Sequence, residues 1–351
     1  MNRIRVVMKR YASCALVFAF LWLLHSVNVL AQTGEQSGKQ SGSRKPILKP
    51  AVLSDVEKND STWKLEPASI ADLKLPQLSE GQPAAGKKVS ITPKEYENTN
   101  VFHTLYLPSD WKAAGERLPI IFEYTGNFFP ASGSTGQVED AGLGFGLSGG
   151  KYIWVSLPFI NAAGNANEVT WWGDESATIG YAKRNVPRII EQFNADPERV
   201  FLCGFSRGSI GINYIGLHDD EISKLWSAFV THDHFDGVRE WRGTSWGSPL
   251  EKYRAESVER LKRVGERPYL VCQNGNSQST MAFIKSSLSK DDSQPNVGNN
   301  FVLNAVSTIE IFGEFPNGIA KHPHTDRWLL KPSRYREATW SWMNRVATKK
   351  E

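Results

Sequence analysis

Residues 199–217 read RVFLCGFSRGSIGINYIGL, and this stretch decides how the rest of the chain is interpreted. Its apolar run at 200–203 predicts a buried strand, and the residues from Arg207 onward predict a helix packed against a sheet. Between them lies a Gly-x-Ser-x-Gly motif centred on Ser206. A strand that turns directly into a helix strains the backbone of the serine, and the flanking glycines leave room for the turn. The stretch therefore predicts a serine hydroxyl lifted clear of the sheet, at the positive end of a helix.

The same motif occurs at two other places, around Ser148 (146–150) and around Ser245 (243–247). Ser148 comes before an apolar strand and not after one, and Ser245 lies in a polar loop that bears tryptophan. The chemistry requires a strand, a turn and a helix in that order. Ser206 is therefore the candidate nucleophile.

The first 31 residues have the pattern of a secretory signal peptide. Four basic residues precede an apolar core at 12–24, and Val-Leu-Ala at 29–31 offers a small-residue cleavage site. The alternative is a retained membrane anchor, for which the apolar core is short. We expect export to the periplasm or the extracellular space and, because no later stretch is apolar enough for a span, no membrane association after cleavage.

Removal of the signal peptide also changes the charge of the protein. The whole chain carries +4, but the signal contains four of the 41 Lys and Arg residues and none of the 37 Asp and Glu residues. The exported protein would be neutral, so nothing favours a nucleic-acid partner. Its two remaining cysteines, Cys203 and Cys272, fall on predicted strands that a third strand should separate. Two strand spacings exceed disulfide reach, which predicts buried free thiols.

Residues 32–86 are predicted to be a flexible tether followed by an extended, proline-bearing lead-in. From 87 to 347 predicted strands alternate with helices, the pattern of an α/β domain whose mostly parallel sheet is covered on both faces. The expected strands are 88–91, 101–107, 118–124, 151–157, 200–203, 225–231, 268–272 and 308–312. The expected helices are 175–193 with a kink or restart at Pro187, one within the insert 238–266, 279–288, and a closing helix with Tyr335, Ala338, Trp342 and Val346 on one side.

A serine hydroxyl is a poor nucleophile until a base takes its proton, and that base needs an orienting acid. Two histidines, His322 and His324, lie in the loop after the last predicted strand, where they can meet a serine on a central strand. We favour His324 as the base because Asp326 and Trp328 follow it and can hold the loop. His322 is the alternative.

The GFSRG motif, its strand and the late histidine resemble the α/β-hydrolase family over about residues 87–347. The resemblance implies an eight-stranded sheet and the chain order nucleophile, acid, histidine. The residues themselves predict the small insert, at 238–266 after the sixth strand. The resemblance also implies an oxyanion hole made by the N–H of Arg207 and one from the loop after LPIIFEY, at Thr125 or Gly126. It implies no cofactor.

The position of the orienting acid departs from the family pattern. The usual position, after the strand that follows the insert, reads QNGNS at 273–277 and holds no carboxylate. Asp236 and Asp233, after the preceding predicted strand, are the replacements. We favour Asp236 because it lies further past the strand end and has more reach. Asn276 and Glu314 are the next alternatives.

Two further patterns allow other roles. The pairs His232/His234 and His322/His324 have spacings that zinc sites use, but both pairs lie in predicted loops without supporting cysteines, so no metal is expected. Trp171 and Trp172 lie in a loop expected at the carboxyl edge of the sheet, where such folds bind ligands. Their aromatic faces suit a sugar or aryl group, although packing of the loop is the alternative.

These patterns together favour an exported serine hydrolase that acts through an acyl-enzyme on a carboxylic ester, either a small molecule or an acylated polysaccharide. One alternative is a serine peptidase of the same fold, because the same three side chains cleave amides. The other is a non-catalytic binding protein on a hydrolase scaffold, since the usual acid is missing.

Overall fold

The computed structural model describes residues 64–65, 72–275, 277–288 and 300–348. The predicted signal peptide and residues 32–63 of the predicted tether and lead-in lie outside this part of the chain. The described residues of the lead-in are held by the domain. The buried Leu65 donates its N–H to Asn344 Oδ1 at 2.9 Å, and Leu73 donates its N–H to the Leu330 carbonyl at 2.8 Å.

Within the described residues, eight strands form one sheet in the order β1-β2-β4-β3-β7-β8-β9-β10. The pairs β1/β2 and β2/β4 are antiparallel, and every other neighbouring pair is parallel. The expected α/β class with its opening antiparallel pair is therefore confirmed. The strands are β1 Lys88–Ile91, β2 His103–Tyr106, β3 Leu118–Tyr124, β4 Ile153–Leu157, β7 Ala195–Phe205, β8 Ala228–His232, β9 Tyr269–Asn274 and β10 Phe301–Val306.

The centre of the sheet is the centre of the core. All seven residues of β3 are buried, and the last six of β7, from Val200 to Phe205, are buried as well. Nearly continuous apolar runs of this kind belong to parallel strands that are covered on both faces. A small hairpin, β5 Phe159–Ile160 and β6 Asn167–Glu168, follows β4 outside the main sheet.

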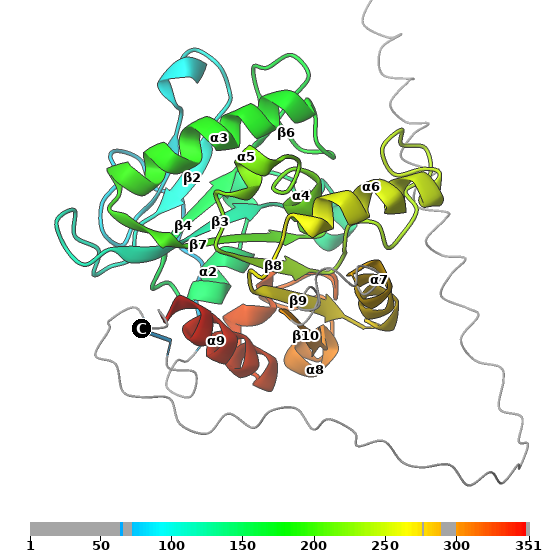
Figure 1. Ribbon diagram of the computed structural model, residues 1–351. Helices are drawn as coiled ribbons and strands as arrows, with labels where there is room; N and C mark the ends of the chain where they lie inside the picture. The colour runs from blue at the N-terminus through cyan, green and yellow to red at the C-terminus, as the bar shows by residue number, and fades with distance from the viewer. Residues whose placement is uncertain (1–63, 66–71, 276, 289–299, 349–351) are drawn as a thin grey trace, which may run out of the picture. The chain divides into compact units, whose positions relative to one another are not determined.

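Helices cover both faces of the sheet. Figure 1 shows α3, α4, α5 and α6 on one side and α2 and α9 on the other. The α-helices are α2 Leu143–Ser148, α3 Glu175–Gln192, α4 Arg207–Tyr214, α5 Asp220–Ser223, α6 Leu250–Lys262, α7 Gln278–Leu288, α8 Thr308–Phe312 and α9 Arg334–Ala347. The insert after the sixth strand of the sheet is present as the segment between β8 and β9, which contains α6.

Helix α3 is continuous from Glu175 to Gln192, so the predicted restart at Pro187 does not occur. Proline removes one backbone hydrogen bond from a helix. Here the loss is offset by packing, because Ala182, Val186 and Ile189 are buried on the face of α3 that covers the sheet.

The prediction of a last strand at 308–312 is wrong. These residues form helix α8, and the last strand is the preceding β10, Phe301–Val306. The side chain of Ser307 accepts a hydrogen bond from the Glu310 N–H at 3.2 Å and so caps the helix. The sequence Ser-Thr-Ile-Glu at 307–310 is a capping-box pattern, which the β-branched residues within it concealed.

The buried face of helix α9 differs by one residue from the predicted face. Tyr335 and Trp342 are buried as expected, but Ala338 is exposed, because the buried face is centred on Thr339 and Met343.

Cys203 and Cys272 are free and buried, on β7 and β9 with β8 between them, which confirms the prediction of separate thiols.

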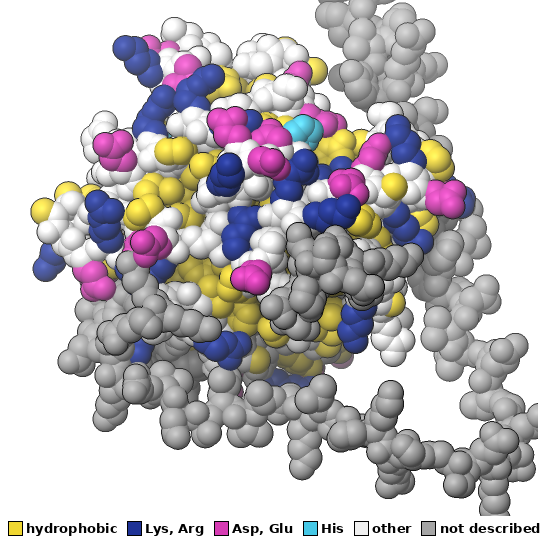
Figure 2. All heavy atoms as spheres, viewed as in Figure 1, with side chains coloured by type: hydrophobic (Ala, Val, Ile, Leu, Met, Phe, Trp, Pro, Cys, Tyr) yellow, Lys and Arg dark blue, Asp and Glu magenta, His cyan; other side chains and the backbone are white. Residues whose placement is uncertain are grey.

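The surface carries both signs of charge. On the face seen in Figure 2, Lys and Arg side chains alternate with Asp and Glu side chains. Within the part of the chain that the structure describes, no helix is both long enough and apolar enough to span a bilayer.

Candidate active site

Ser206 stands where β7 turns into α4, at the centre of the sheet. Its backbone has φ 55° and ψ −115°, a strained conformation for any residue other than glycine. The flanking glycines allow it, because a Cβ on Gly208 would lie 1.8 Å from the Tyr124 carbonyl oxygen. Strand, turn and helix therefore have the geometry that the sequence predicted for this serine alone.

The two other serines of the repeated motif have different surroundings. Ser148 is the last residue of α2, fully buried, and donates its hydroxyl to the Phe145 carbonyl at 3.0 Å. Ser245 lies in the segment between β8 and α6. Neither follows a strand of the sheet.

The close approach at Gly208 gives a stability prediction. Gly208→Ala forces its methyl group into the backbone of β3, so we expect it to lower the free energy of unfolding by at least about 4 kcal/mol. Gly180→Ala is the matched control, because a Cβ at that position within α3 meets nothing within 4 Å. We expect the control to raise stability by about 0.5–1 kcal/mol. Urea unfolding of both variants measures the difference, and equal stabilities would contradict the packing described for the turn.

His324 is the histidine that reaches the serine. Its Nε2 lies 3.0 Å from Ser206 Oγ, and its Nδ1 lies 3.0 Å from Asp233 Oδ2. An ionised carboxylate can only accept, so Nδ1 carries the proton and Nε2 offers its lone pair to the serine hydroxyl. The side chain of His324 is 20% exposed, which leaves this chain of contacts open to a ligand.

Asp233 is brought to the site by the pairing of neighbouring strands. Phe205 of β7 is paired with His232 of β8, and the Ser206 N–H donates to the His232 carbonyl at 3.0 Å. Ser206 and Asp233 are thus the first residues past the ends of adjacent parallel strands. Asp233 has φ 64°, a left-handed conformation that aspartate tolerates, and its Oδ1 accepts from the Asn274 N–H at 2.7 Å.

The structure gives the favoured acid, Asp236, a different partner. Its Oδ2 accepts from Arg260 Nε at 2.8 Å and its Oδ1 from Nη2 at 3.2 Å, and Asp236 is fully buried. The expectation that extra distance from the strand end gives more reach was wrong, because the chain turns at Asp233. The residues after that turn pack toward α6, which carries Arg260.

The electrostatics at Asp233 favour the ionised acid. Burial alone would raise the pKa of this carboxyl, but His232, His324 and the Asn274 N–H together hold it at about 2. The carboxylate is therefore charged at neutral pH and can stabilise a positive charge on His324. It is also fixed in place, since both of its oxygens have partners.

The residues expected to form the oxyanion hole lie beside the serine. Arg207 is the first residue of α4, so its N–H has no acceptor inside the helix. Gly126, in the loop after β3, lies so close that a Cβ there would be 3.4 Å from Ser206 Cβ. Thr125 Oγ1 donates to the Gly136 carbonyl at 3.2 Å and so fixes the same loop. The three residues named for the oxyanion hole are thus brought together, with Gly126 the one in contact with the serine.

The Arg207 side chain has a role that the sequence analysis missed. It is 1% exposed, and its guanidinium donates to the Trp171 carbonyl at 2.8 Å and to the Gly136 carbonyl at 3.1 Å. Its Nη2 also donates to Thr125 Oγ1 at 3.2 Å. One buried cation thereby fastens two loops around the turn that holds Ser206.

Three more side chains support the histidine loop. Asn274 Nδ2 donates to the Pro323 carbonyl at 3.3 Å, and His232 Nε2 donates to the Thr325 carbonyl at 3.0 Å. His322 Nδ1 accepts from the His324 N–H at 3.0 Å, so the alternative base supports the loop, and His324 is the histidine hydrogen-bonded to the serine. Of the remaining candidates for the acid, Glu314 is exposed and Asn276 lies outside the described residues.

The pattern that suggested zinc does not produce a cluster of ligands. Among the described residues, no group of three or more His, Cys, Asp or Glu side chains is arranged to hold a metal ion. In the first pair, His232 is directed at a backbone carbonyl, whereas the His234 ring lies 5.4 Å from the His324 ring and 5.2 Å from Trp241.

The two tryptophans differ in how much of each ring is available. Trp172 is 3% exposed and stacked on Tyr214 at 4.8 Å, so it packs against the end of α4. Trp171 is half-buried and lies 5.0 Å from Trp241 and 4.9 Å from Trp246. Through Trp241 and His234 this aromatic cluster reaches the ring of His324. Packing is thus the role that the structure gives Trp172.

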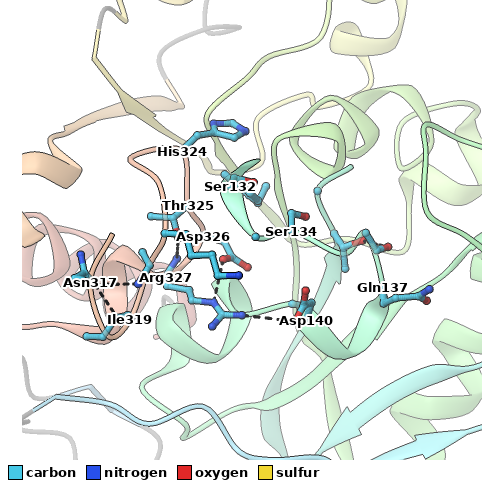
Figure 3. Close-up of a pocket in the computed structure, with 18 of the residues that line it drawn as sticks. Ser132, Ser134, Gln137, Asp140, Asn317, Ile319, His324, Thr325, Asp326 and Arg327 are labelled. Carbon is cyan, nitrogen blue, oxygen red and sulfur yellow. Dashed lines mark hydrogen bonds and ion pairs between the residues drawn. The ribbon is translucent and has the colours of Figure 1, made fainter. Parts of the chain in front are cut away.

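A cavity of about 230 Å³, which we call the side chamber, adjoins His324. Gly126 and His324 line it, so it lies beside Ser206. Its other walls come from two loops, one with Ser132, Ser134 and Asp140 and the other with Lys321, Asp326 and Arg327. Figure 3 shows Arg327 facing Asp140 across the space between these loops.

The sheet order, the strained serine after β7 and the histidine after the last strand agree with what the resemblance implied. The strand order and the helices on both faces are those expected of an α/β-hydrolase type of fold. No family model matches the chain, and no curated protein does.

Among solved structures, three illustrate what the chain is similar to. The isopeptidase AtxE2 is 14% identical over 73% of this chain, with a TM-score of 0.43, and only 39% of that longer protein is covered. The esterase Est22 with p-nitrophenol is 12% identical over 75% of this chain and 80% of that one, with a TM-score of 0.46. The feruloyl esterase module from Clostridium thermocellum with sinapinate is 13% identical over 78% and 96%, with a TM-score of 0.44.

Proposed function

We propose that the protein is an exported serine hydrolase that cleaves a carboxylic ester through an acyl-enzyme on Ser206. The observation that carries the proposal is the continuous chain of contacts from Ser206 Oγ to His324 and on to Asp233, with 3.0 Å at each step. A strained serine, an unprotonated ring nitrogen and a buried carboxylate are the parts needed to activate a hydroxyl at neutral pH.

In the first half of the reaction, Ser206 Oγ attacks the ester carbonyl carbon while His324 Nε2 takes the hydroxyl proton. The carbonyl oxygen becomes negative, and the N–H groups of Arg207 and Gly126 donate to it. Asp233 stabilises the imidazolium that forms. The tetrahedral intermediate then collapses, the C–O bond to the alcohol breaks, and His324 returns its proton to the departing oxygen.

In the second half, water takes the place of the alcohol. His324 Nε2 removes a proton from the water, and the resulting hydroxide attacks the carbonyl of the acyl group on Ser206. The same two N–H groups hold the second oxyanion. Collapse of this intermediate breaks the bond to Oγ, releases the carboxylic acid and returns the proton to the serine.

Export is the part of the proposal that depends on the sequence alone, because it follows from the signal-peptide pattern of the first 31 residues.

The preference for an ester over an amide is tested with a matched pair, the p-nitrophenyl ester and the p-nitroanilide of the same acyl group. We expect the ester to have the higher kcat/KM, and a faster anilide would indicate a peptidase.

Covalent labelling separates this proposal from a binding protein and from metal chemistry. We expect a fluorophosphonate to add one label to Ser206, detected by intact mass and peptide mapping, and to abolish esterase activity. Prolonged dialysis against a strong chelator should leave activity unchanged. The Ser148→Ala and Ser245→Ala variants are matched controls that should label as the wild type does. Absence of label on Ser206 would favour a non-catalytic binding protein, and loss of activity to the chelator would favour a metal site.

A further inference from the structure

The side chamber differs in its chemistry from a pocket for an acyl chain. Its charged side chains are Asp140, Asp326, Lys321 and Arg327, two acidic and two basic, so its net charge is zero. Hydroxyl and amide side chains stand among them, including Ser132, Ser134 and Gln137. Such walls do not suit a free anion, which needs an excess of cations, and an alkyl chain would leave their polar groups without hydrogen-bond partners. They suit a neutral group with many hydroxyls.

The side chamber also has donors and acceptors available for a ligand. Arg327 Nη2 lies 3.7 Å from Asp140 Oδ1, and Arg327 Nε lies 3.8 Å from Asp326 Oδ1. Both distances are too long for direct hydrogen bonds. A hydroxyl group between such an arginine and a carboxylate accepts from the first and donates to the second. Within the described residues, the Arg327 side chain has ion pairs at these distances but no hydrogen bond.

The two facing groups are held in position by their own loops. Asp140 Oδ2 accepts from the Thr135 N–H at 3.1 Å and from its hydroxyl at 2.7 Å, which leaves Oδ1 directed at Arg327. The Arg327 N–H donates to Thr325 Oγ1 at 3.2 Å, next to the fully buried Trp328. A ligand would therefore meet a preformed pair, which reduces the entropy lost on binding.

Size and place define what the side chamber can hold. Its volume, about 230 Å³, is below the ~300–1,000 Å³ of pockets for drug-sized ligands, so it has room for one ring. Apolar side chains, Phe205 and Ile319 among them, also line it and suit the C–H face of a sugar. Because Gly126 and His324 form part of the wall, an ester group on that ring lies next to Ser206.

We propose that the side chamber binds one sugar ring of the substrate, with Asp140 and Arg327 hydrogen-bonded to its hydroxyls. The proposal rests on the proposed function and names its substrate class, a sugar ester. Two sources share this chemistry. The ring is either the alcohol part, as in an acetylated sugar, or the acyl part, as in an ester of a uronic acid.

Kinetics on three esters test the proposal. The probes are an O-acetylated methyl xyloside, the methyl ester of methyl glucuronide, and p-nitrophenyl acetate, which has no sugar. We expect wild type to cleave one of the two sugar esters, which identifies the source of the ring. On that ester, Arg327→Gln and Asp140→Asn should each lower kcat/KM by about 10- to 100-fold, because each removes a hydrogen bond that involves a charged group. Hydrolysis of p-nitrophenyl acetate should not change.

The matched control is Arg184→Gln, on helix α3. Arg184 is an exposed arginine that is likewise in a loose ion pair, 3.7 Å from Glu95, and it is not part of the side chamber. We expect this variant to behave as wild type on all three esters. An equal loss on all three esters in the Arg327 and Asp140 variants would indicate a structural role, and no loss on the sugar ester would place the ring elsewhere. Either result overturns the proposal.

A binding measurement separates failure of this proposal from failure of the proposed function. Saturation-transfer NMR of methyl xyloside and methyl glucuronide uses the Ser206→Ala variant, with and without Arg327→Gln. Binding that is lost with Arg327→Gln would support the side chamber even if wild type cleaved no ester, in which case only the proposed function fails. Cleavage of p-nitrophenyl acetate with no binding of either sugar would overturn the sugar site and leave the proposed function intact.

Discussion

Ser206→Ala is expected to lower kcat by about 10⁴–10⁶-fold on the best ester, with the melting temperature essentially unchanged. Turnover falls because the nucleophilic Oγ atom is removed, and the melting temperature is unchanged because nothing else is removed. The backbone strain at φ 55° is imposed by the turn between β7 and α4 and remains in the variant. Steady-state kinetics with active-site titration measure the loss, and thermal unfolding checks the fold.

The matched controls for Ser206→Ala are the two serines that share its motif. Ser245→Ala should leave kcat unchanged, because Ser245 does not stand at the end of a strand. Ser148→Ala should also leave kcat unchanged, although removal of its buried hydroxyl contact is expected to lower stability by about 1 kcal/mol. Wild-type turnover in Ser206→Ala would exclude Ser206 as the nucleophile.

Asp233→Asn is expected to lower kcat by about 10⁴-fold, since an amide in that place no longer fixes the histidine tautomer or stabilises the imidazolium. The amide keeps the shape of the side chain, and it can still accept from the Asn274 N–H through its oxygen. The pH dependence of kcat/KM provides a second measurement. The wild-type carboxyl, with a pKa of about 2, is ionised across the pH range of the assay, so the loss in Asp233→Asn should persist at every pH measured.

Asp236→Asn is the paired test, and we expect the opposite profile from it. Loss of the Asp236 charge leaves the Arg260 guanidinium buried without a charged partner, which should lower the free energy of unfolding by about 3 kcal/mol or more. Folded enzyme should retain turnover close to that of wild type. A 10⁴-fold loss in Asp236→Asn together with normal activity in Asp233→Asn would show that the acid is Asp236 after all.

Much of the fold was predictable because local sequence determines it. The strand LPIIFEY is a mostly apolar run, and β3 is fully buried over the same seven residues. The turn at Ser206 was predictable for a steric reason, since Gly208 passes within contact of the β3 backbone. Helix α8 was missed because Thr, Ile and Phe favour strands in isolation, while the cap from Ser307 and the pairing of β10 with β9 decide otherwise.

Some residues of the site were likewise predictable from the sequence, and others were not. His324 was predictable because a loop after the last strand can cross the carboxyl ends of its neighbours, whichever residues form that strand. The supports of this loop were not predictable, since the Asn274 and His232 side chains contact backbone carbonyls about 50 and 90 residues away in the chain. The side chamber has no sequence pattern at all, because its facing groups Asp140 and Arg327 come from loops on separate parts of the chain.

The sequence by itself determined the class of fold, the serine that ends the central strand and the histidine that faces it. Each depends on short-range chemistry: an apolar run, two glycines around a strained turn, and a late loop. Only the tertiary structure decided between Asp233 and Asp236, which lie three residues apart after the same strand. The choice depends on a left-handed turn at Asp233 and on Arg260 of α6, which binds Asp236 in the core and leaves Asp233 for the histidine.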